Sequence, residues 1–367
     1  MRNPRRLGLP AVFATTALVL SSCGVFGGGG SDLKIGLVTD VGTLDDANFN
    51  QFSWEGAKSG AEAVGAAEPQ SVVTTASADY QKNIQSFIDQ DYDIIVTVGF
   101  ALGNDTTIAA KENPEINFIG VDQGICVDEE GDPDATFTCA GDAATLLPNY
   151  QGLVFKEQQP GYLAGIVAAS ISESGHIAAV GGTAVVPAVV NYIAGYANGA
   201  ASVNPDIEVE VQYVSEAPDA AAFNDPAGGK AFAEQLLQQQ SDVDVMFQVA
   251  GKTGNGVLEA ACDAGIHGIG VDVDQHLSLP EATCIVTSAE KKLTKAVSDA
   301  IQRIADEEDA GGTVLLDATT DSVGLAPFAD MADLISEETQ TAIDDAFEAM
   351  KSGELDPCDG PAACFGA

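Results

Sequence analysis

The chain has 367 residues, of which 55 are acidic and 15 are basic, so its formal net charge is −40 at neutral pH. Such a surface repels the phosphates of nucleic acids and anionic lipid headgroups, and we therefore expect no nucleic-acid partner. The charge does not indicate disorder, because 46% of the residues are hydrophobic and they fall into strongly patterned segments.

The N-terminus has the pattern of a secretory signal. Three arginines precede an apolar run over residues 7–20, which is too short to span a bilayer. The ending Leu20-Ser21-Ser22-Cys23 resembles a bacterial lipobox, in which the cysteine is lipidated; the alternative is an ordinary signal with a chance cysteine. We expect a signal peptide over residues 1–22, and a lipidated Cys23 with a glycine-rich tether over residues 23–32. The mature chain would be extracytoplasmic, anchored by lipid to the bacterial cell membrane, and long enough for two α/β domains.

Six cysteines remain when Cys23 is set aside. An even number outside the cytoplasm favours disulfides. Pairing nearest neighbours is the simplest of the possible connectivities, and it predicts the pairs Cys126–Cys139, Cys262–Cys284 and Cys358–Cys364. The sequence has no Cys-x-x-Cys motif, and its three histidines lie near no cysteine cluster. We therefore predict no metal site, and no cofactor.

Short β-rich runs alternate with longer helical patterns, which is typical of a parallel α/β fold. The predicted strands are residues 34–40, 94–100, 116–122, 176–182, 207–214, 243–250, 267–272, 283–288 and 323–327. The predicted helices are residues 49–64, 81–90, 161–171, 187–201, 228–239, 256–265, 290–308 and 337–350.

Two features predict a division into lobes. Residues 124–150 are rich in Asp, Gly and Pro, which indicates a surface excursion, and a new series of βα units begins near residue 159. The late elements suit a chain that crosses between the lobes three times. We predict an N-terminal lobe of residues 33–152 plus 285–312, and a C-terminal lobe of residues 153–284 plus 313–367.

Almost every predicted strand ends in a distinctive residue, and three of these ends are Asp40, Asp122 and Asp272. In open parallel sheets, ligands bind outside the carboxyl ends of the strands. One acidic strand end is commonly a helix cap. Several such ends on one side, beside glycines and aromatics, favour a ligand cleft.

Individual residues suggest roles in this cleft. Phe49 begins a helix, where it could stack on a planar ring or anchor its own lobe. The side chains of Asp40, Asn50, Asp122 and Asp272 suit ring nitrogens and hydroxyl groups.

A glycine-rich segment at residues 249–256 is interpreted as a turn between a strand and a helix. It is not a Walker loop, because Lys252 lies between the glycines. The backbone N–H groups of Gly251 and Gly254 could still approach a ligand. Lys291 is one of few cations near the predicted cleft.

The order of these motifs resembles the basic membrane protein family, the PnrA-like purine-nucleoside-binding lipoproteins of ABC transporters. The first motif is Asp40-x-Gly42-x-x-Asp45-Asp46-x-x-Phe49-Asn50-Gln51. The likeness continues through residues 155–165, 180–182, 191–196, 212–214, 247–256, 270–275 and 287–291, and so covers essentially the whole mature chain.

The resemblance implies a type I periplasmic-binding-protein fold, with two Rossmann-like lobes of parallel strands, a three-crossover hinge and a ligand between the lobes. It also implies that Phe49 stacks on the base and that a second aromatic covers the other face. Phe247 is the first choice for that aromatic and Tyr192 the second, although Tyr192 replaces the more usual Phe.

The remaining site residues follow from the same resemblance. Asp40, Asn50 and Asp122 would face polar ring atoms of the base. Asp272 and Lys291 would meet the ribose. The protein would then be a monomeric, non-enzymatic binding lipoprotein that delivers a purine nucleoside such as adenosine, guanosine or inosine to an ABC permease.

Other functions remain open at this stage, because a fold does not fix a ligand. Relatives have been assigned riboflavin, and a receptor that reports to a membrane sensor would have the same features. Residues 39–46 also resemble the calcium loop of nucleoside hydrolases, Asp-x-Asp-Pro-Gly-x-Asp-Asp. Val38 and Val41 occupy two of its key positions, and one extra residue follows Gly42, which disfavours a calcium site.

Overall fold

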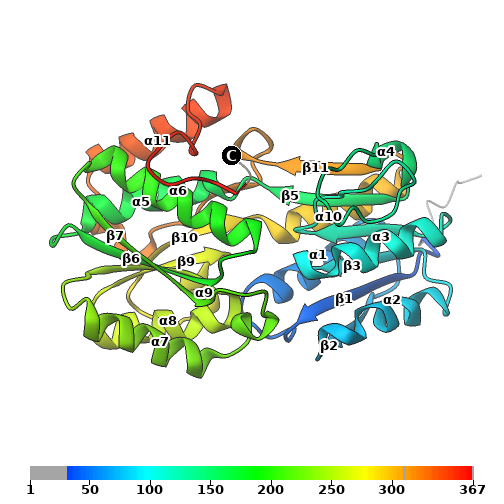
Figure 1. Cartoon of the computed structure of the whole chain (residues 1–367), viewed down its shortest axis with the longest axis horizontal. Helices are drawn as coiled ribbons and strands as arrows, with labels where there is room; N and C mark the ends of the chain where they lie inside the picture. The colour runs from blue at the N-terminus through cyan, green and yellow to red at the C-terminus, as the bar shows by residue number, and fades with distance from the viewer. Residues whose placement is uncertain (1–30, 309–310, 366–367) are drawn as a thin grey trace, which may run out of the picture.

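The computed structural model describes residues 31–308 and 311–365, so the predicted signal peptide and Cys23 lie outside the described residues. The described chain forms two lobes, each built on a six-stranded sheet (Figure 1). The first sheet has the order β11-β5-β4-β3-β1-β2 and is parallel throughout. The second has the order β12-β10-β9-β8-β6-β7, in which only β12 is antiparallel to its neighbour. The predicted α/β class and two-lobed fold are confirmed.

The strands are β1 (Ile35–Val41), β2 (Gln70–Thr74), β3 (Ile94–Val98), β4 (Asn117–Val121), β5 (Tyr150–Phe155), β6 (His176–Thr183), β7 (Glu208–Ser215), β8 (Val245–Val249), β9 (His267–Asp272), β10 (Ile285–Lys291), β11 (Gly312–Leu316) and β12 (Val323–Leu325). The helices are α1 (Phe49–Ala63), α2 (Tyr80–Ile88), α3 (Gly103–Glu112), α4 (Ala143–Leu146), α5 (Gln158–Ile171), α6 (Pro187–Val203), α7 (Pro226–Gln239), α8 (Gly251–Ala264), α9 (Gln275–Ser278), α10 (Leu293–Ala305) and α11 (Glu337–Ser352). Short 3-10 turns include η3 (Ala220–Phe223).

Both sheets are covered by helices on both faces. Strand β3 reads Ile-Ile-Val-Thr-Val and is buried at every position, as expected for a strand inside a parallel sheet. In the first lobe, α2 and α3 pack on one face and α1 and α10 on the other. In the second lobe, α7 and α8 cover one face, while α5 and α6 cover the other. The carboxyl ends of the strands are left for the site.

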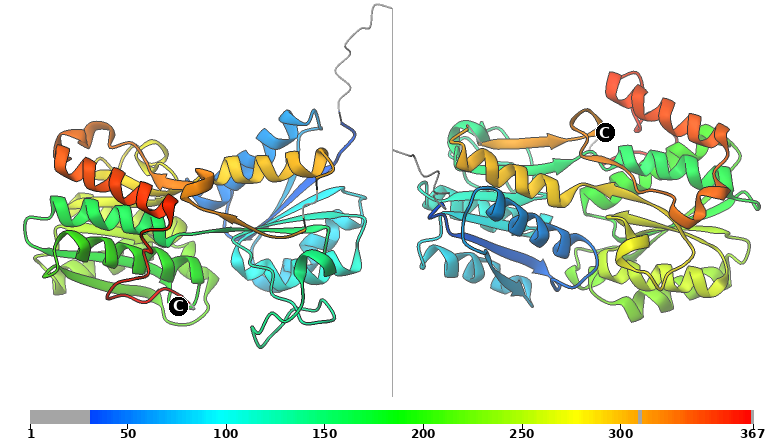
Figure 2. Two further views of the ribbon diagram at one scale, coloured as in Figure 1. Left: turned by 90° about the horizontal axis from the view of Figure 1, so that it is seen from above. Right: turned by 180° about the vertical axis from the view of Figure 1, so that it is seen from behind.

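The chain crosses between the lobes three times, as predicted, but the crossings differ from the predicted boundaries (Figure 2). They follow Phe155, Lys291 and Leu316. The boundary at residue 152 was placed too early because β5, a strand of the first sheet, continues to Phe155. The segment beginning at 285 was wrong because β10 pairs with β9 and β12 in the second sheet. Strand β11 pairs with β5, so the first lobe extends to residue 316.

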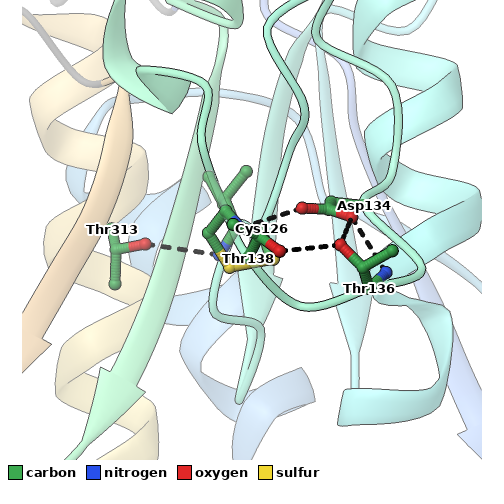
Figure 3. Close-up of a disulfide and its surroundings, with 7 residues drawn as sticks. Cys126, Asp134, Thr136, Thr138 and Thr313 are labelled. Atoms are coloured by element: carbon green, nitrogen blue, oxygen red, sulfur yellow. Dashed lines mark hydrogen bonds between the residues drawn. A yellow bond between two sulfur atoms is a disulfide. The ribbon is translucent and has the colours of Figure 1, made fainter.

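All three predicted disulfides are confirmed: Cys126–Cys139, Cys262–Cys284 and Cys358–Cys364. The first closes a loop of the predicted surface excursion (Figure 3). Within that loop the Asp134 carboxylate accepts hydrogen bonds from the Thr136 hydroxyl and from backbone N–H groups. The loop is therefore held by both a covalent bond and a local hydrogen-bond network.

Candidate functional site

Lys291 lies at the centre of the site, where β10 ends and the chain crosses to the first lobe. Its Nζ atom is 2.5 Å from an Asp122 oxygen, 3.2 Å from a Glu157 oxygen and 3.8 Å from an Asp272 oxygen. Asp122 follows β4 in the first lobe, whereas Asp272 ends β9 in the second. The lysine is only 3% exposed, so one buried ammonium joins carboxylates from both lobes.

These charges are strongly coupled. Burial raises the pKa of Glu157 to about 7, with Lys291 opposing the shift and Asp122 adding to it. Burial likewise raises the pKa of Asp272 to about 6, again against the attraction of Lys291. Burial acts to lower the pKa of Lys291, but the surrounding carboxylates outweigh it and the pKa is raised. The cluster has more acids than its single cation can neutralise, so it favours ligands that donate hydrogen bonds.

The two aspartates are positioned by the same local device in each lobe. Asp122 has a φ of 57° and Asp272 a φ of 66°, a left-handed conformation that is unusual for residues other than glycine. A buried glutamine follows each of them. The Gln123 amide donates to two backbone carbonyls near the end of β3, and Gln275 accepts from the backbone N–H of Val271. Each glutamine thus braces the loop that turns its aspartate toward Lys291.

Aromatic rings surround the same lysine. The ring centres of Phe49 and Tyr192 both lie 5.5 Å from the Lys291 Nζ atom, and that of Phe155 lies 5.4 Å away. The Tyr192 hydroxyl donates to Asp272 and to the backbone carbonyl of Ala289. The structure therefore brings Phe49 and Tyr192 to the predicted site.

Asp46 organises the start of α1. Its carboxylate accepts hydrogen bonds from the backbone N–H groups of Asn48, Asn50 and Gln51 and from the Asn50 side-chain amide. These hydrogen bonds cap α1, and they occupy the carboxylate oxygens that a calcium ion would need as ligands. Asn50 is brought close to the site, next to Phe49, with its Oδ1 atom buried and unpaired among the described residues.

Asp40 is bonded within its own lobe. The Tyr80 hydroxyl donates to Asp40 Oδ1, and the Val41 backbone N–H donates to the same atom. Burial raises the pKa of Asp40, and the bond from Tyr80 opposes the shift. Tyr80 begins α2, so Asp40 at the end of β1 is held by the neighbouring helix.

Phe247 does not lie where it was expected. It is fully buried in β8, and its ring centre is 5.0 Å from that of Tyr196 and 6.1 Å from that of Tyr192. In a sheet covered on both faces, Phe247 points to the α5–α6 face and forms part of the hydrophobic core. The prediction of a stacking role for Phe247 was therefore wrong.

A different aromatic, Phe223, lies at the ends of the strands in the second lobe. It ends η3, which also contacts β1 of the first lobe. A Cβ atom on Gly182 would lie 2.2 Å from the Phe223 ring, and one on Gly251 would lie 3.5 Å from the Phe223 Cβ atom. The ring thus rests on two glycine positions at the lobe interface.

The glycine-rich segment is helical rather than a turn. Helix α8 begins at Gly251, which has a φ of 54°. Gly254 lies inside this helix, and a Cβ atom there would be 1.6 Å from Gln248 Oε1. Packing against Gln248 explains this glycine without a ligand, whereas Gly251 remains at the interface.

The lobes also contact each other through residues of α8 and α9. Lys252 Nζ donates to Thr43 Oγ1 at 2.9 Å and lies 3.3 Å from an Asp45 oxygen. Asn255 Nδ2 donates to the Asp46 carbonyl at 2.9 Å, and Ser278 Oγ donates to the Ala47 carbonyl at 2.8 Å. We call Lys252, Asn255 and Ser278 the latch. Through it, α8 and α9 hold the β1–α1 loop, and the lobes are closed.

A surface pocket of about 550 Å³ adjoins the Lys291 cluster, between α1, α10 and the ends of β9 and β10. Its lining includes Phe52, Glu290 and Lys295, and Lys291 is the predicted ligand residue that borders it. Burial raises the pKa of Glu290 to about 7, with nearby Asp274 adding to the shift. Phe49 and Asp122 do not line this pocket, which shares Lys291 with the cluster.

Sequence reasoning missed several residues at the site. Glu157 lies within the matched segment of residues 155–165, and an acid at the point where a strand crosses to a helix of the other lobe was the available signal. Phe223 lies shortly before Asp225-Pro226, which caps and begins α7, so it shares with Phe49 the signal of an aromatic near a helix start. Tyr80 gave no signal of its own.

The described residues contain neither a metal-binding cluster nor a membrane-spanning helix. Among residues 31–308 and 311–365, no group of three or more His, Cys, Asp or Glu side chains is arranged to hold a metal ion. In the same ranges, no helix is long and apolar enough to cross a membrane.

Curated relatives match most of the chain. The ABC transporter nucleoside-binding protein BmpA of Lactococcus lactis is 28% identical over 335 residues, covering 85% of this chain and 88% of that protein. Basic membrane protein A of Borreliella burgdorferi is 27% identical over 287 residues, covering 77% of this chain and 75% of that protein.

Solved structures share the fold. An ABC transporter solute-binding protein from Aeropyrum pernix superposes with a TM-score of 0.73 at 24% identity, covering 88% of this chain and 92% of that one. Another from Conexibacter woesei gives a TM-score of 0.65 at 22% identity, covering 88% and 98%. These likenesses confirm the type I periplasmic-binding fold.

The family model described as "ABC transporter substrate-binding protein PnrA-like" matches residues 34–355, which include both lobes and all three crossings. The resemblance inferred from the motifs is thereby confirmed. The chain belongs to the Bmp family of PnrA-like substrate-binding proteins of ABC transporters.

Proposed function

We propose that this binding protein captures purine nucleosides between its lobes and delivers them to the permease of an ABC importer. One observation carries the proposal: Phe49 lies beside Lys291, whose ammonium is shared by carboxylates from both lobes. An aromatic face next to hydrogen-bond acceptors suits a planar base attached to a sugar with hydroxyl groups. The nucleoside-binding relative from Lactococcus lactis supports the same ligand class.

Each group has a distinct role in this proposal. Phe49 stacks on one face of the base, and Phe223 replaces Phe247 as the aromatic of the second lobe. Asp40, Asn50 and Asp122 bond polar ring atoms, as in the family pattern. Asp272 and Lys291 bond the ribose, and Glu157 shares that lysine.

The energies are sufficient for such a ligand. Base stacking contributes on the order of 1–3 kcal/mol per aromatic ring. Hydrogen bonds to charged groups contribute roughly 1.5–3 kcal/mol each. After the cost of closing the lobes, these terms suit a micromolar to nanomolar site.

The negative charge of the cluster also predicts which ligands bind weakly. A 5′-phosphate adds about −1.5 to −2 charges beside Asp122, Asp272 and Glu157, which cannot donate hydrogen bonds to it when ionised. Like charges in a desolvated site strongly disfavour binding. Nucleotides should therefore bind far more weakly than nucleosides.

Calorimetry with adenosine, guanosine, inosine, deoxyadenosine, AMP and riboflavin tests the function. Ribonucleosides should bind best, deoxynucleosides about tenfold or more weakly because an acceptor is left unpaired, and AMP barely at all. Phe49→Ala should weaken every nucleoside, whereas Asp272→Ala should chiefly remove the preference for ribose. Tight AMP binding, or binding of riboflavin but of no nucleoside, would contradict the proposal.

The compartment completes the proposal. Binding proteins of ABC importers are extracytoplasmic, and three disulfides suit an oxidising environment. We propose a monomer anchored through a lipid on Cys23, a residue outside the described part of the chain.

A further inference from the structure

The Asn48 side chain is buried without a partner. The residue is 0% exposed, and within the described chain neither its Nδ2 donor nor its Oδ1 acceptor has a hydrogen-bond partner. Buried amides are almost always bonded, because leaving one unpaired costs the loss of its hydration. A side chain with both atoms unpaired therefore calls for a partner that the chain itself does not supply.

Helix capping does not supply that partner. Asn48 is the N-cap residue of α1, a position where asparagine normally accepts a bond from the helix backbone. Here its side chain makes no such bond. Asp46 has taken over the task, because its carboxylate accepts from the N–H groups of Asn48, Asn50 and Gln51. The Asn48 amide is thereby released from its usual local role.

The position of Asn48 links the unpaired amide to the site. The preceding residue, Ala47, accepts a hydrogen bond from Ser278 of the other lobe, and the following residue is Phe49. Two further buried oxygens that lack partners in the described residues, Oδ1 of Asn50 and Oδ1 of Asp122, belong to the same site. Asp122 is joined to Lys291, which lies 5.5 Å from the Phe49 ring centre. Two residues with unpaired polar atoms thus flank Phe49 in the sequence, and a third is linked to its ring through Lys291.

We propose that Asn48 contacts the ligand directly, donating one hydrogen bond from Nδ2 and accepting one at Oδ1. The inference rests on the proposed function and adds a specificity residue to it. The matching ligand surface has a donor next to an acceptor, as on the 6-amino or 6-keto edge of a purine and on the vicinal diol of ribose. An amide can present its two ends in either order, so Asn48 serves amino and keto purines alike.

The direction in which Asn48→Leu changes the affinity for inosine tests the contact. Leucine has a similar size but no polar atoms. If Asn48 bonds the ligand, inosine affinity measured by calorimetry falls about 10- to 100-fold, the loss of two hydrogen bonds. If Asn48 only fills space, removing an unpaired buried amide leaves the affinity unchanged or raises it, and the inference is overturned.

Tyr196→Phe is the matched control. The Tyr196 hydroxyl is also buried and unpaired within the described residues, but it belongs to the α5–α6 core of the second lobe. This variant should bind inosine as the wild type does. If Asn48→Leu does not fold, Asn48→Asp keeps the shape and the acceptor while losing the donor, and a weakened inosine complex is again expected.

Two ligand analogues identify the surface that Asn48 contacts. Purine riboside lacks the 6-substituent, and 2′-deoxyinosine lacks one hydroxyl of the diol. If Asn48 contacts the base, Asn48→Leu abolishes a wild-type preference of about tenfold for inosine over purine riboside. If it contacts the sugar, the variant abolishes the preference for inosine over 2′-deoxyinosine instead. Both results support direct contact, whereas retention of both preferences at wild-type affinity overturns it.

The two levels of the proposal fail separately. Wild-type protein that binds no purine nucleoside overturns the proposed function. Wild-type protein that binds inosine tightly, beside an Asn48→Leu variant that binds it equally well, overturns only the role of Asn48.

Discussion

Glu157 and Asp272 share one ammonium with Asp122, and their raised pKa values have a consequence for stability. The folded-state pKa of Glu157 is about 7, above its ordinary value of 4.5. Between these pH values the folded protein binds more protons than the unfolded chain. Stability from this residue is therefore complete below about pH 4.5 and is lost as the pH rises through about 7.

Glu157→Gln should remove that pH dependence. The variant keeps the shape of the side chain but cannot ionise. The difference in unfolding free energy, variant minus wild type, should therefore be larger at pH 8 than at pH 5 by on the order of 1–3 kcal/mol. Denaturant unfolding of the ligand-free protein at both pH values measures it. Glu129→Gln, at an exposed position, is the control and should show no such difference. An equal effect of Glu157→Gln at both pH values would contradict the coupling.

Helices α5 and α6 are in direct backbone contact through glycines on both helices. A Cβ atom on Gly165 would lie 2.0 Å from the Tyr196 carbonyl oxygen, and one on Gly199 would lie 1.9 Å from that of Tyr162. Any side chain at these positions must push the helices apart. Because α6 carries Tyr192 to the Lys291 cluster, the spacing of these helices also sets the geometry of the site.

Gly199→Ala should accordingly destabilise the protein. Overpacking against a rigid backbone costs about 1–3 kcal/mol or more, which should lower the thermal midpoint by several degrees. Gly324→Ala is the control, because no atom lies within 4 Å of its would-be Cβ atom, and it should leave the midpoint nearly unchanged. Equal midpoints for the two variants would show that α5 and α6 can separate freely.

Local patterns predicted most elements, and the misses have physical causes. Strand β5 was not predicted because Gln151 and Gly152 interrupt its apolar pattern. The buried Gln151 is satisfied by Arg303 and by the Ala300 carbonyl, and α10 brings these partners from far along the chain. Phe247 was misplaced because successive residues of a strand covered on both faces are equally buried, so sequence alone does not tell which side faces a cleft.

Part of the site was predictable from the order of the strands. Asp122, Asp272 and Lys291 were expected together because the carboxyl ends of parallel strands meet at one edge of each sheet. Glu157 follows β5 at a crossing between the lobes, so its place beside Lys291 depends on how the two sheets are set against each other. Spacing along the chain does not encode that distance.

On the scale of the whole molecule, the latch stabilises the closed arrangement of the lobes, whereas solvation of the separated surfaces stabilises an open one. Lys252, Asn255 and Ser278 contact the β1–α1 loop through side chains, and two of these contacts are to backbone carbonyls. Apparent affinity is reduced when the binding-competent state is only partly populated. The latch should therefore affect affinity without touching the ligand.

Replacing Lys252 by Met and Ser278 by Ala together should weaken nucleoside binding severalfold. The loss of about 1–2 kcal/mol of closing energy should also give the free protein a larger radius of gyration in X-ray scattering. Lys230→Met is the control, because Lys230 contacts Glu259 and Asp263 within its own lobe. Unchanged affinity in the double variant, with unchanged scattering, would show that other contacts hold the lobes together.

Strand β11 comes late in the chain, and its position limits the order in which the two lobes can fold during synthesis. It pairs with β5 at the edge of the first sheet, although every strand of the second sheet except β12 precedes it in the chain. Because the chain is synthesised from its N-terminus, the first lobe cannot be completed until residue 316 is available. Helix α10, which covers α1, also comes late in the chain. Until then β5 has an open edge that other chains can pair with. The two lobes must mature almost together, and a fragment that ends before β11 should aggregate rather than persist as a half-molecule.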